Sequence, residues 1–189
     1  MSPGSVVIVS GPPGAGKSTV ARLLAEHSPV PAAIHLKTDG FYSGIVKGFV
    51  APWLAEADAQ NAAVVDAVAA SADRYARAGY EVVVDGVFGP WFLEPWLALA
   101  ERGVDVHYVV LRPDEHTTLL RGVSRKAPDA LIDPQVLRSI WQKFANLGRY
   151  EPHTLASSQQ TPAETAVRVR RALASGQLRL TRELALERV

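Results

Sequence analysis

Short β-branched runs alternate with longer stretches of helical periodicity along the chain. Five runs are typical of strands, the last of them weakly: 5–10, 33–37, 80–84, 105–111 and 153–156. Between them the apolar positions follow the period of an amphipathic helix over 17–27, 54–79, 91–102, 114–122, 134–147 and 162–175. Because strand–helix–strand units join by right-handed crossovers, this pattern predicts an open, doubly wound α/β sheet that binds ligands at the carboxyl ends of its strands.

Composition and charge are those of an ordinary globular protein. The 189 residues carry 20 Lys and Arg against 19 Asp and Glu, a formal net charge of +1, which is too small for a protein that coats nucleic acid or an anionic membrane. The chain has no cysteine, so disulfides and thiolate zinc sites are excluded. It also has no basic leader and no apolar run near the roughly 18 residues of a membrane span. We therefore expect one cytoplasmic domain over residues 1–189, with neither a nucleic-acid nor a membrane partner.

A glycine-rich segment follows the first predicted strand and opens the next helix. It matches G-x-x-x-x-G-K-[ST] at every position and reads Gly11-Pro12-Pro13-Gly14-Ala15-Gly16-Lys17-Ser18, with Thr19 after it. Glycines let consecutive backbone N–H groups turn toward one polyphosphate, and the helix N-terminus adds partial positive charge. In such a loop the lysine bridges the β- and γ-phosphate oxygens and the serine hydroxyl holds Mg²⁺. The segment thus predicts a nucleoside triphosphate site with Lys17 and Ser18 in these roles.

Two carboxylates stand at the ends of predicted strands. Asp85 ends the valine run 82–84, and Asp39 follows the second strand. A carboxylate at the end of a buried strand beside a phosphate loop holds Mg²⁺ directly or through water, which is the role expected of Asp85. Asp39 would face the γ-phosphate from the acceptor side, where it can take the proton of an attacking hydroxyl. Asp-Gly pairs are also common in turns, so a purely structural role for Asp39-Gly40 stays open. An exchange of the metal and base roles between Asp39 and Asp85 stays open as well.

These motifs together resemble those of the small P-loop kinases of nucleosides and small molecules. The chain is similar to chloramphenicol phosphotransferase, to gluconate kinase and particularly to bacterial proteins of the AAA_33 type. The similarity rests on residues 11–19, Asp39-Gly40-Phe41-Tyr42, Pro52-Trp53-Leu54 with Gln60-Asn61, and Asp85-Gly86. It implies a three-layer P-loop NTPase fold, with a five-stranded parallel sheet in the order 2-3-1-4-5, helices on both faces and a lid. It also implies ATP and Mg²⁺, with Asp39 as the catalytic base.

A basic segment after the fourth predicted strand is placed to cover the nucleotide. Arg121 lies in a predicted helix and Arg125 in the loop after it. A guanidinium can stack on a purine or stabilise charge as the γ-phosphate leaves. In the resembled kinases this segment, about 121–134, is a mobile lid with one arginine against adenine and a later one on phosphate, which match Arg121 and Arg125. Basic residues on exposed helices are often only solvated. The loop 157–161 stands where such proteins hold the base.

Arginine is absent from the segments that flank the ends of the second and third strands, 23–73 and 78–101. Nucleoside monophosphate kinases orient the acceptor phosphate there with bidentate arginines. Aromatic residues occur instead, and those expected to line the acceptor are Phe41, Tyr42, Trp53 and Trp91. Each of them alone is more often a core residue, but together they suit a sugar face or a hydrophobic compound. A neutral acceptor is therefore favoured.

The sequence predicts an ATP-dependent phosphotransferase that moves the γ-phosphate to a hydroxyl of a sugar, natural product or antibiotic. Its catalytic residues would be Asp39, Lys17 and Arg125. Two alternatives stay open: a nucleoside or nucleotide kinase, and an ATP-binding regulatory module that works through a protein partner. The histidines show no metal-ligand spacing, and His35 is interpreted as a structural residue of the second strand. The sequence alone sets no oligomeric state.

Overall fold

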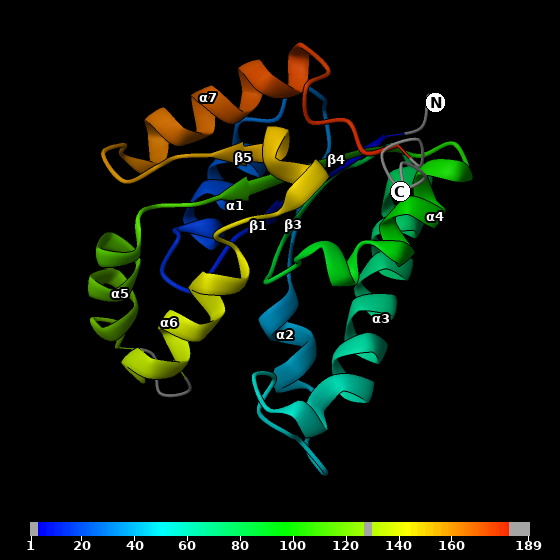
Figure 1. Cartoon of the computed structure of the whole chain (residues 1–189). Helices are drawn as coiled ribbons and strands as arrows, with labels where there is room; N and C mark the ends of the chain where they lie inside the picture. Colours follow the sequence, from blue (N-terminus) through cyan, green and yellow to red (C-terminus); the bar gives the residue numbers. More distant parts are fainter. Residues whose placement is uncertain (1–3, 127–129, 182–189) are drawn as a thin grey trace.

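A five-stranded parallel sheet forms the centre of the protein. The structure, a computed structural model, describes residues 4–126 and 130–181 (Figure 1). The strands lie in the order β2-β3-β1-β4-β5, and every pairing of neighbours is parallel. Their bounds are β1 Ser5–Ser10, β2 Ala33–Lys37, β3 Glu81–Asp85, β4 Asp105–Leu111 and β5 Thr154–Leu155. The order and direction confirm the predicted sheet.

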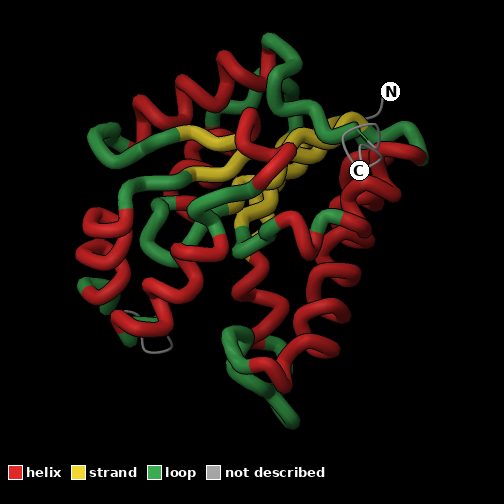
Figure 2. Tube along the Cα trace, in the orientation of Figure 1, coloured by secondary structure: helices red, strands yellow, loops and turns green. Residues whose placement is uncertain are grey.

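Helices cover both faces of the sheet and complete three layers (Figure 2). The helices α1 (Lys17–Glu26) and α7 (Pro162–Ala174) pack on one face, where Val7 and Val9 of β1 point. The helices α3 (Asp58–Arg77) and α4 (Glu94–Glu101) pack on the other, where Val6 and Ile8 point. Because successive side chains of a strand point to opposite faces, a strand that is apolar throughout supplies both cores. The sequences of β1 and β3 therefore contain continuous runs of apolar residues.

Three further helices flank the carboxyl ends of the strands. Helix α2 (Thr38–Ser43) follows β2 directly and, with the amino-terminal part of α3, forms an arm. The helices α5 (Glu115–Val123) and α6 (Pro134–Lys143) pack against each other after β4. Figure 1 shows the arm and the α5–α6 pair projecting on opposite sides of the sheet end. The predicted lid, about 121–134, includes the last residues of α5, the segment after it and the first residue of α6, and its residues 127–129 are outside the described part of the chain.

Several element bounds differ from those predicted. The helix expected from residue 54 begins at Asp58, after a 3₁₀ turn over Ala55–Ala57. The one expected over 91–102 is divided into a 3₁₀ turn, Pro90–Phe92, and α4, because prolines start helices rather than continue them. The helix expected over 134–147 ends at Lys143. Helix α2 was not predicted at all.

The fifth strand is only two residues long because the chain before it winds into a 3₁₀ helix, Gly148–His153. The rest of the exposed edge of β4 is paired with the segment that follows α7. Tyr108 N donates to Leu178 O and Leu180 N donates to Val106 O, both at 2.8 Å. An unpaired strand edge invites association with other chains, and this antiparallel segment closes it. Among the described residues, no helix has the length and apolar character needed to cross a membrane.

Candidate active site

The phosphate loop joins β1 to α1 and needs glycine at three positions. Gly11, Gly14 and Gly16 have φ angles of 140°, 90° and 86°, which side chains rarely allow. A Cβ on Gly11 would lie 2.2 Å from Leu111 O, and one on Gly14 would lie 2.5 Å from Thr118 O. These two glycines let the loop touch β4 and α5. A Cβ on Gly16 would meet nothing within 4 Å, so at this position only the backbone angle favours glycine.

Substituting Gly14 by alanine should therefore destabilise the protein. The variant Gly14→Ala meets both backbone strain and the Thr118 carbonyl, and we expect it to lower the free energy of unfolding by about 1–3 kcal/mol. Gly103→Ala is the matched control, because Gly103 has a φ of 82° and open space around it. Urea denaturation measures both variants. Equal losses would show that only the backbone angle matters and that contact between loop and α5 does not.

Asp85 connects the phosphate loop to the second strand. Ser18 Oγ donates to Asp85 Oδ2 at 2.5 Å, and His35 Nε2 lies 2.6 Å from Asp85 Oδ1. Burial by itself raises the pKa of this carboxyl, but the hydrogen bonds from His35 and Ser18 and the ammonium of Lys17 outweigh it and hold the pKa below its usual range. Asp85 is therefore an ionised carboxylate although it is only 5% exposed.

Lys17 lies within electrostatic range of the other charged side chains of the site. Its Nζ donates to Pro12 O at 3.0 Å. Burial lowers the pKa of Lys17 to about 8; Arg125 acts in the same direction, while the carboxylates of Asp85 and Asp39 oppose it. The residues that the sequence predicted as catalytic, Asp39, Lys17 and Arg125, thus lie within electrostatic reach of one another, together with Asp85. Asp39 and Arg125 are exposed and can meet a ligand.

Side chains of α3 hold the arm in place. Tyr42 OH donates to Asn61 Oδ1 at 2.8 Å, and Asn61 Nδ2 donates to Pro52 O at 2.8 Å. Gln60 bonds both the N–H and the carbonyl of Val50. Burial, with the nearby carboxylate of Asp39, raises the pKa of Tyr42 to about 12, so its hydroxyl stays a hydrogen-bond donor. The Gln60-Asn61 pair therefore shapes the loop between α2 and α3.

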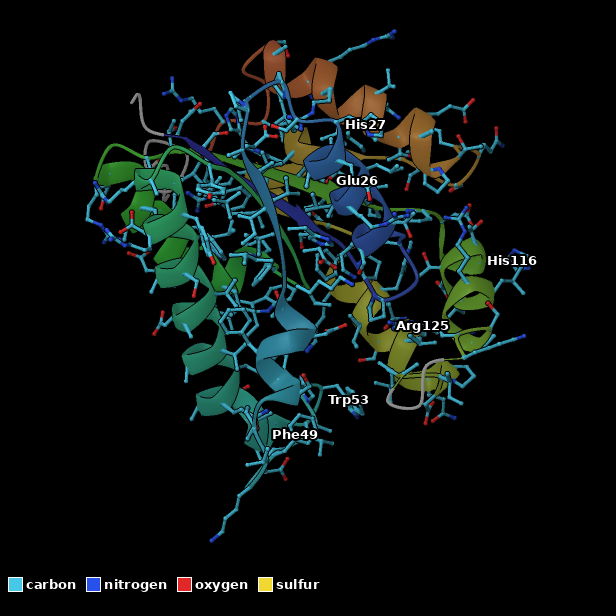
Figure 3. All side chains as sticks on the ribbon, turned by 180° about the vertical axis from the view of Figure 1, so that it is seen from behind. Glu26, His27, Phe49, Trp53, His116 and Arg125 are labelled. Atoms are coloured by element: carbon cyan, nitrogen blue, oxygen red, sulfur yellow. The ribbon has the colours of Figure 1, made fainter. Side chains whose placement is uncertain are left out.

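The four aromatic residues predicted to line the acceptor fall into two groups. Phe41 and Tyr42 are half-buried and pack against the core. Trp53 and Trp91 are 42% and 49% exposed. A Cβ on Gly89 would lie 2.2 Å from the Trp91 ring, so this ring covers the backbone just past Asp85. Figure 3 shows Trp53 on the arm and Arg125 on the side of the α5–α6 pair.

A cavity of about 220 Å³ lies beside the phosphate loop. Its lining residues come from the loop, α1, α5, the segment after β5 and α7: Ala15, Gly16, Val20, Arg121, Ser157, Gln160, Pro162 and Thr165. Arg121 Nη2 donates to Ser158 O at 3.2 Å. Ser157 is 3% exposed, and within the described chain its Oγ has no hydrogen-bond partner. A buried polar atom normally has a partner, so the unpaired hydroxyl is an unusual feature of the segment that borders this cavity.

The donor set also fits a magnesium ion. Mg²⁺ takes oxygen ligands, usually one or two from the protein together with water and phosphate oxygens. Ser18 Oγ and the Asp85 carboxylate are adjacent oxygens of that kind, next to the N-terminus of α1. The part of the chain that the structure describes has no cluster of three or more His, Cys, Asp or Glu suited to a metal. An ion held by these two oxygens would take its other ligands from water and from a bound phosphate.

Sequence reasoning did not find every side chain at this site. His35 was interpreted as structural, yet it contacts Asp85. Thr38 Oγ1 donates to Asp85 O at 2.7 Å and so connects α2 to β3. The register of β2 on β3 places Lys37 beside Asp85 and His35 beside Val83. A histidine two residues before the end of the neighbouring strand is the signal that would have found the His35 contact.

Comparisons with known proteins agree with this fold. No curated protein matches the sequence. A sugar kinase from Janibacter sp. is 18% identical with a TM-score of 0.67, over 91% of this chain and 95% of its own. A gluconokinase from Sinorhizobium meliloti is 20% identical with a TM-score of 0.66, over 92% and 93%. The tunicamycin resistance protein of Deinococcus radiodurans is 17% identical with a TM-score of 0.63, over 93% and 98%.

These likenesses show the fold, and a family match bears out the resemblance to proteins of the AAA_33 type. The sequence model of the AAA_33 family, described as an AAA domain, matches residues 6–147. This range includes the phosphate loop, Asp39, Asp85 and Arg125. Since the match covers well over half of the chain, the protein belongs to the AAA_33 family.

Proposed function

We propose that the protein is an ATP-dependent kinase that phosphorylates a hydroxyl group of a small neutral molecule. One observation supports this most directly: the cation Arg125 and the carboxylates of Asp39 and Asp85 lie close enough to the phosphate-loop lysine, Lys17, to influence its ionisation. Phosphoryl transfer requires such an arrangement, because its catalysis consists mainly of positioning and charge stabilisation.

The phosphate loop and the cavity beside it would hold the nucleotide. Backbone N–H groups at the start of α1 bind the phosphates, and Lys17 carries the charge that faces the β- and γ-oxygens. Ser18 and Asp85 would hold Mg²⁺, which when bound neutralises charge on the same phosphates. The cavity accepts the base, with Arg121 and Gln160 among its polar lining residues.

Asp39 would serve as the base on the acceptor side. It accepts the proton of the attacking hydroxyl as that oxygen bonds to the γ-phosphorus. The bond from the γ-phosphorus to the β–γ bridging oxygen breaks, and ADP leaves with that oxygen. Arg125, on the opposite side, stabilises the negative charge that develops on the leaving oxygens. Asp39 stands in the first turn of α2, exposed and next to the core-packed Phe41 and Tyr42.

The acceptor is expected to be neutral and partly apolar. Residues 23–73 and 78–101 hold no arginine. The arm and the segment around β3 therefore lack the bidentate guanidinium groups that orient an acceptor phosphate or carboxylate. Trp53 and Trp91 expose large ring surfaces near the site instead. Ring faces bind the apolar side of sugars and of hydroxylated natural products. The similar structures include a sugar kinase and a tunicamycin resistance protein, which favour no single compound.

A coupled ADP-release screen tests this function. The panel contains neutral sugars, nucleosides, hydroxylated antibiotics, gluconate and nucleoside monophosphates. We expect ADP release to rise with a neutral hydroxyl compound and the product to be its phosphate ester by mass spectrometry. A rise with nucleosides or monophosphates alone would instead support a nucleoside or nucleotide kinase. Tight ATP binding with no acceptor effect would support a regulatory module and refute the proposal.

Trp53 should contribute to acceptor binding and not to ATP binding. We expect Trp53→Ala to raise the acceptor KM about 3–10-fold, corresponding to about 0.5–1.5 kcal/mol of ring contact, with an unchanged KM for ATP. Trp53→Phe keeps a ring and should stay close to the wild type, while Leu54→Ala removes a neighbouring exposed apolar side chain as a control. Steady-state kinetics separate the two KM values. An equal rise in the KM for the acceptor and the KM for ATP would contradict a role for Trp53 in binding the acceptor.

A further inference from the structure

We propose that His35 is a positioning residue that fixes the Asp85 carboxylate for the metal–nucleotide complex. Asp85 lies at the end of β3, and His35 lies on the edge strand β2 beside it. The proposal rests on the proposed function only in requiring that the nucleotide binds with a divalent metal; it does not require transfer to an acceptor.

The two oxygens of Asp85 are each held by a different element. His35 Nε2 lies 2.6 Å from Oδ1, and Ser18 Oγ lies 2.5 Å from Oδ2. The His35 and Asp85 side chains are 11% and 7% exposed. In the parallel register Lys37 is the partner of Asp85, so His35 reaches the carboxylate diagonally from two residues earlier. The backbone carbonyl of Asp85 is fixed independently by Thr38.

The direction of these hydrogen bonds determines which atoms stay free. An ionised carboxylate only accepts hydrogen bonds, so His35 Nε2 and Ser18 Oγ both donate to Asp85. The hydroxyl hydrogen of Ser18 therefore points at Oδ2, and the lone pairs of Ser18 Oγ point away from Asp85. The orientation of the carboxylate plane thus sets the direction in which Ser18 can act as a ligand. His35 holds the far oxygen and so prevents rotation of that plane.

Removing the His35 donor has two separable effects. Oδ1 would lose its hydrogen bond in a nearly buried place, which destabilises the fold. The carboxylate could also turn, which would misplace both candidate ligand oxygens. A purely structural histidine produces the first effect alone. Partners that orient metal ligands typically contribute about 10–100-fold to metal affinity, so metal affinity distinguishes the two roles.

The test compares two amides at position 35. Gln places its amide nitrogen near the position of His Nε2, whereas Asn places its nitrogen near Nδ1, which makes no contact with Asp85. We expect His35→Asn to weaken Mn²⁺ binding about 10–100-fold in the presence of a non-hydrolysable ATP analogue, measured by EPR. His35→Gln should restore most of this affinity. The metal-free affinity for the analogue should not change. His27→Asn, at the exposed end of α1, is the control and should bind Mn²⁺ like the wild type.

Two results would overturn the proposal. One is a Mn²⁺ affinity of His35→Asn equal to that of the wild type, and the other is an equal loss in His35→Asn and His35→Gln. If circular dichroism shows that His35→Asn does not fold, His35→Met, which fills space without a donor, replaces it in the same comparison. A wild type that binds Mn²⁺ and the analogue but phosphorylates no acceptor would count against the proposed function alone, since this measurement involves no transfer.

Discussion

Asp39→Asn should slow phosphate transfer to an accepted hydroxyl compound by about 10²–10⁴-fold, which is the contribution of a general base. Asn has the same size and occupies the same place in the first turn of α2, but it cannot take up the hydroxyl proton. Because Asp39 is exposed, the substitution should leave the free energy of unfolding nearly unchanged. Single-turnover transfer from labelled ATP, with ATP affinity measured in parallel, isolates the chemical step.

A second carboxylate in an equivalent position provides the control. Asp58 is also exposed in the first turn of a helix on the same arm, so Asp58→Asn should retain full activity.

Asp85→Asn distinguishes the two carboxylate roles left open by the sequence. We expect it to raise the Mg²⁺ concentration required for activity, whereas Asp39→Asn should not. If Asp39→Asn turned over an accepted compound at the normal rate, Asp39 would not be the general base. Asp39-Gly40 would then have only a structural role in the turn.

The strands were predictable from the sequence because their signals are local, whereas their order in the sheet came from the resemblance to P-loop kinases. The strands β1, β3 and β4 are almost continuous apolar runs, and the loop after β1 has a spacing that phosphate binding requires. Helix α2 was not predictable in the same way. Its six residues include Gly40, and Asp39-Gly40 is common in turns. Thr38 holds the helix in place, because its hydroxyl donates to the backbone carbonyl of Asp85 in β3. The helix therefore depends on a contact between residues that are far apart in the sequence.

The same distinction separates the predicted site residues from those that were missed. Lys17 and Ser18 belong to a contiguous motif, and Asp39 and Asp85 mark strand ends, so a linear reading finds them. His35 matters because of the register between β2 and β3, and Thr38 because its buried hydroxyl donates to the backbone carbonyl of Asp85. Register and burial are properties of the assembled sheet. Residues that act through them require a structure.

Lys17→Met should reduce kcat/KM for ATP by about 10²–10³-fold, the loss expected when one preorganised positive donor is removed from a transferring phosphate. Methionine keeps the length of the side chain but carries no charge. Nucleotide affinity should fall as well, since Lys17 faces the bound phosphates before and during transfer. Isothermal titration with ATP and steady-state kinetics give the two quantities separately. Lys143→Met, which removes an exposed lysine from the last turn of α6, is the control and should leave nucleotide affinity nearly unchanged.

The lowered pKa of Lys17 gives this prediction a pH dependence with a definite sign. In the protein without nucleotide, burial places the pKa of Lys17 at about 8. The ammonium is therefore present below that pH and is lost as the pH rises above it. Because the phosphates bind the charged form, nucleotide affinity should be constant from neutral pH to about 8 and then fall about tenfold per pH unit. Lys17→Met has no proton to lose and should show a flat profile. Parallel declines in the wild type and in Lys17→Met would mean that another group controls binding, and would contradict the role given to this lysine.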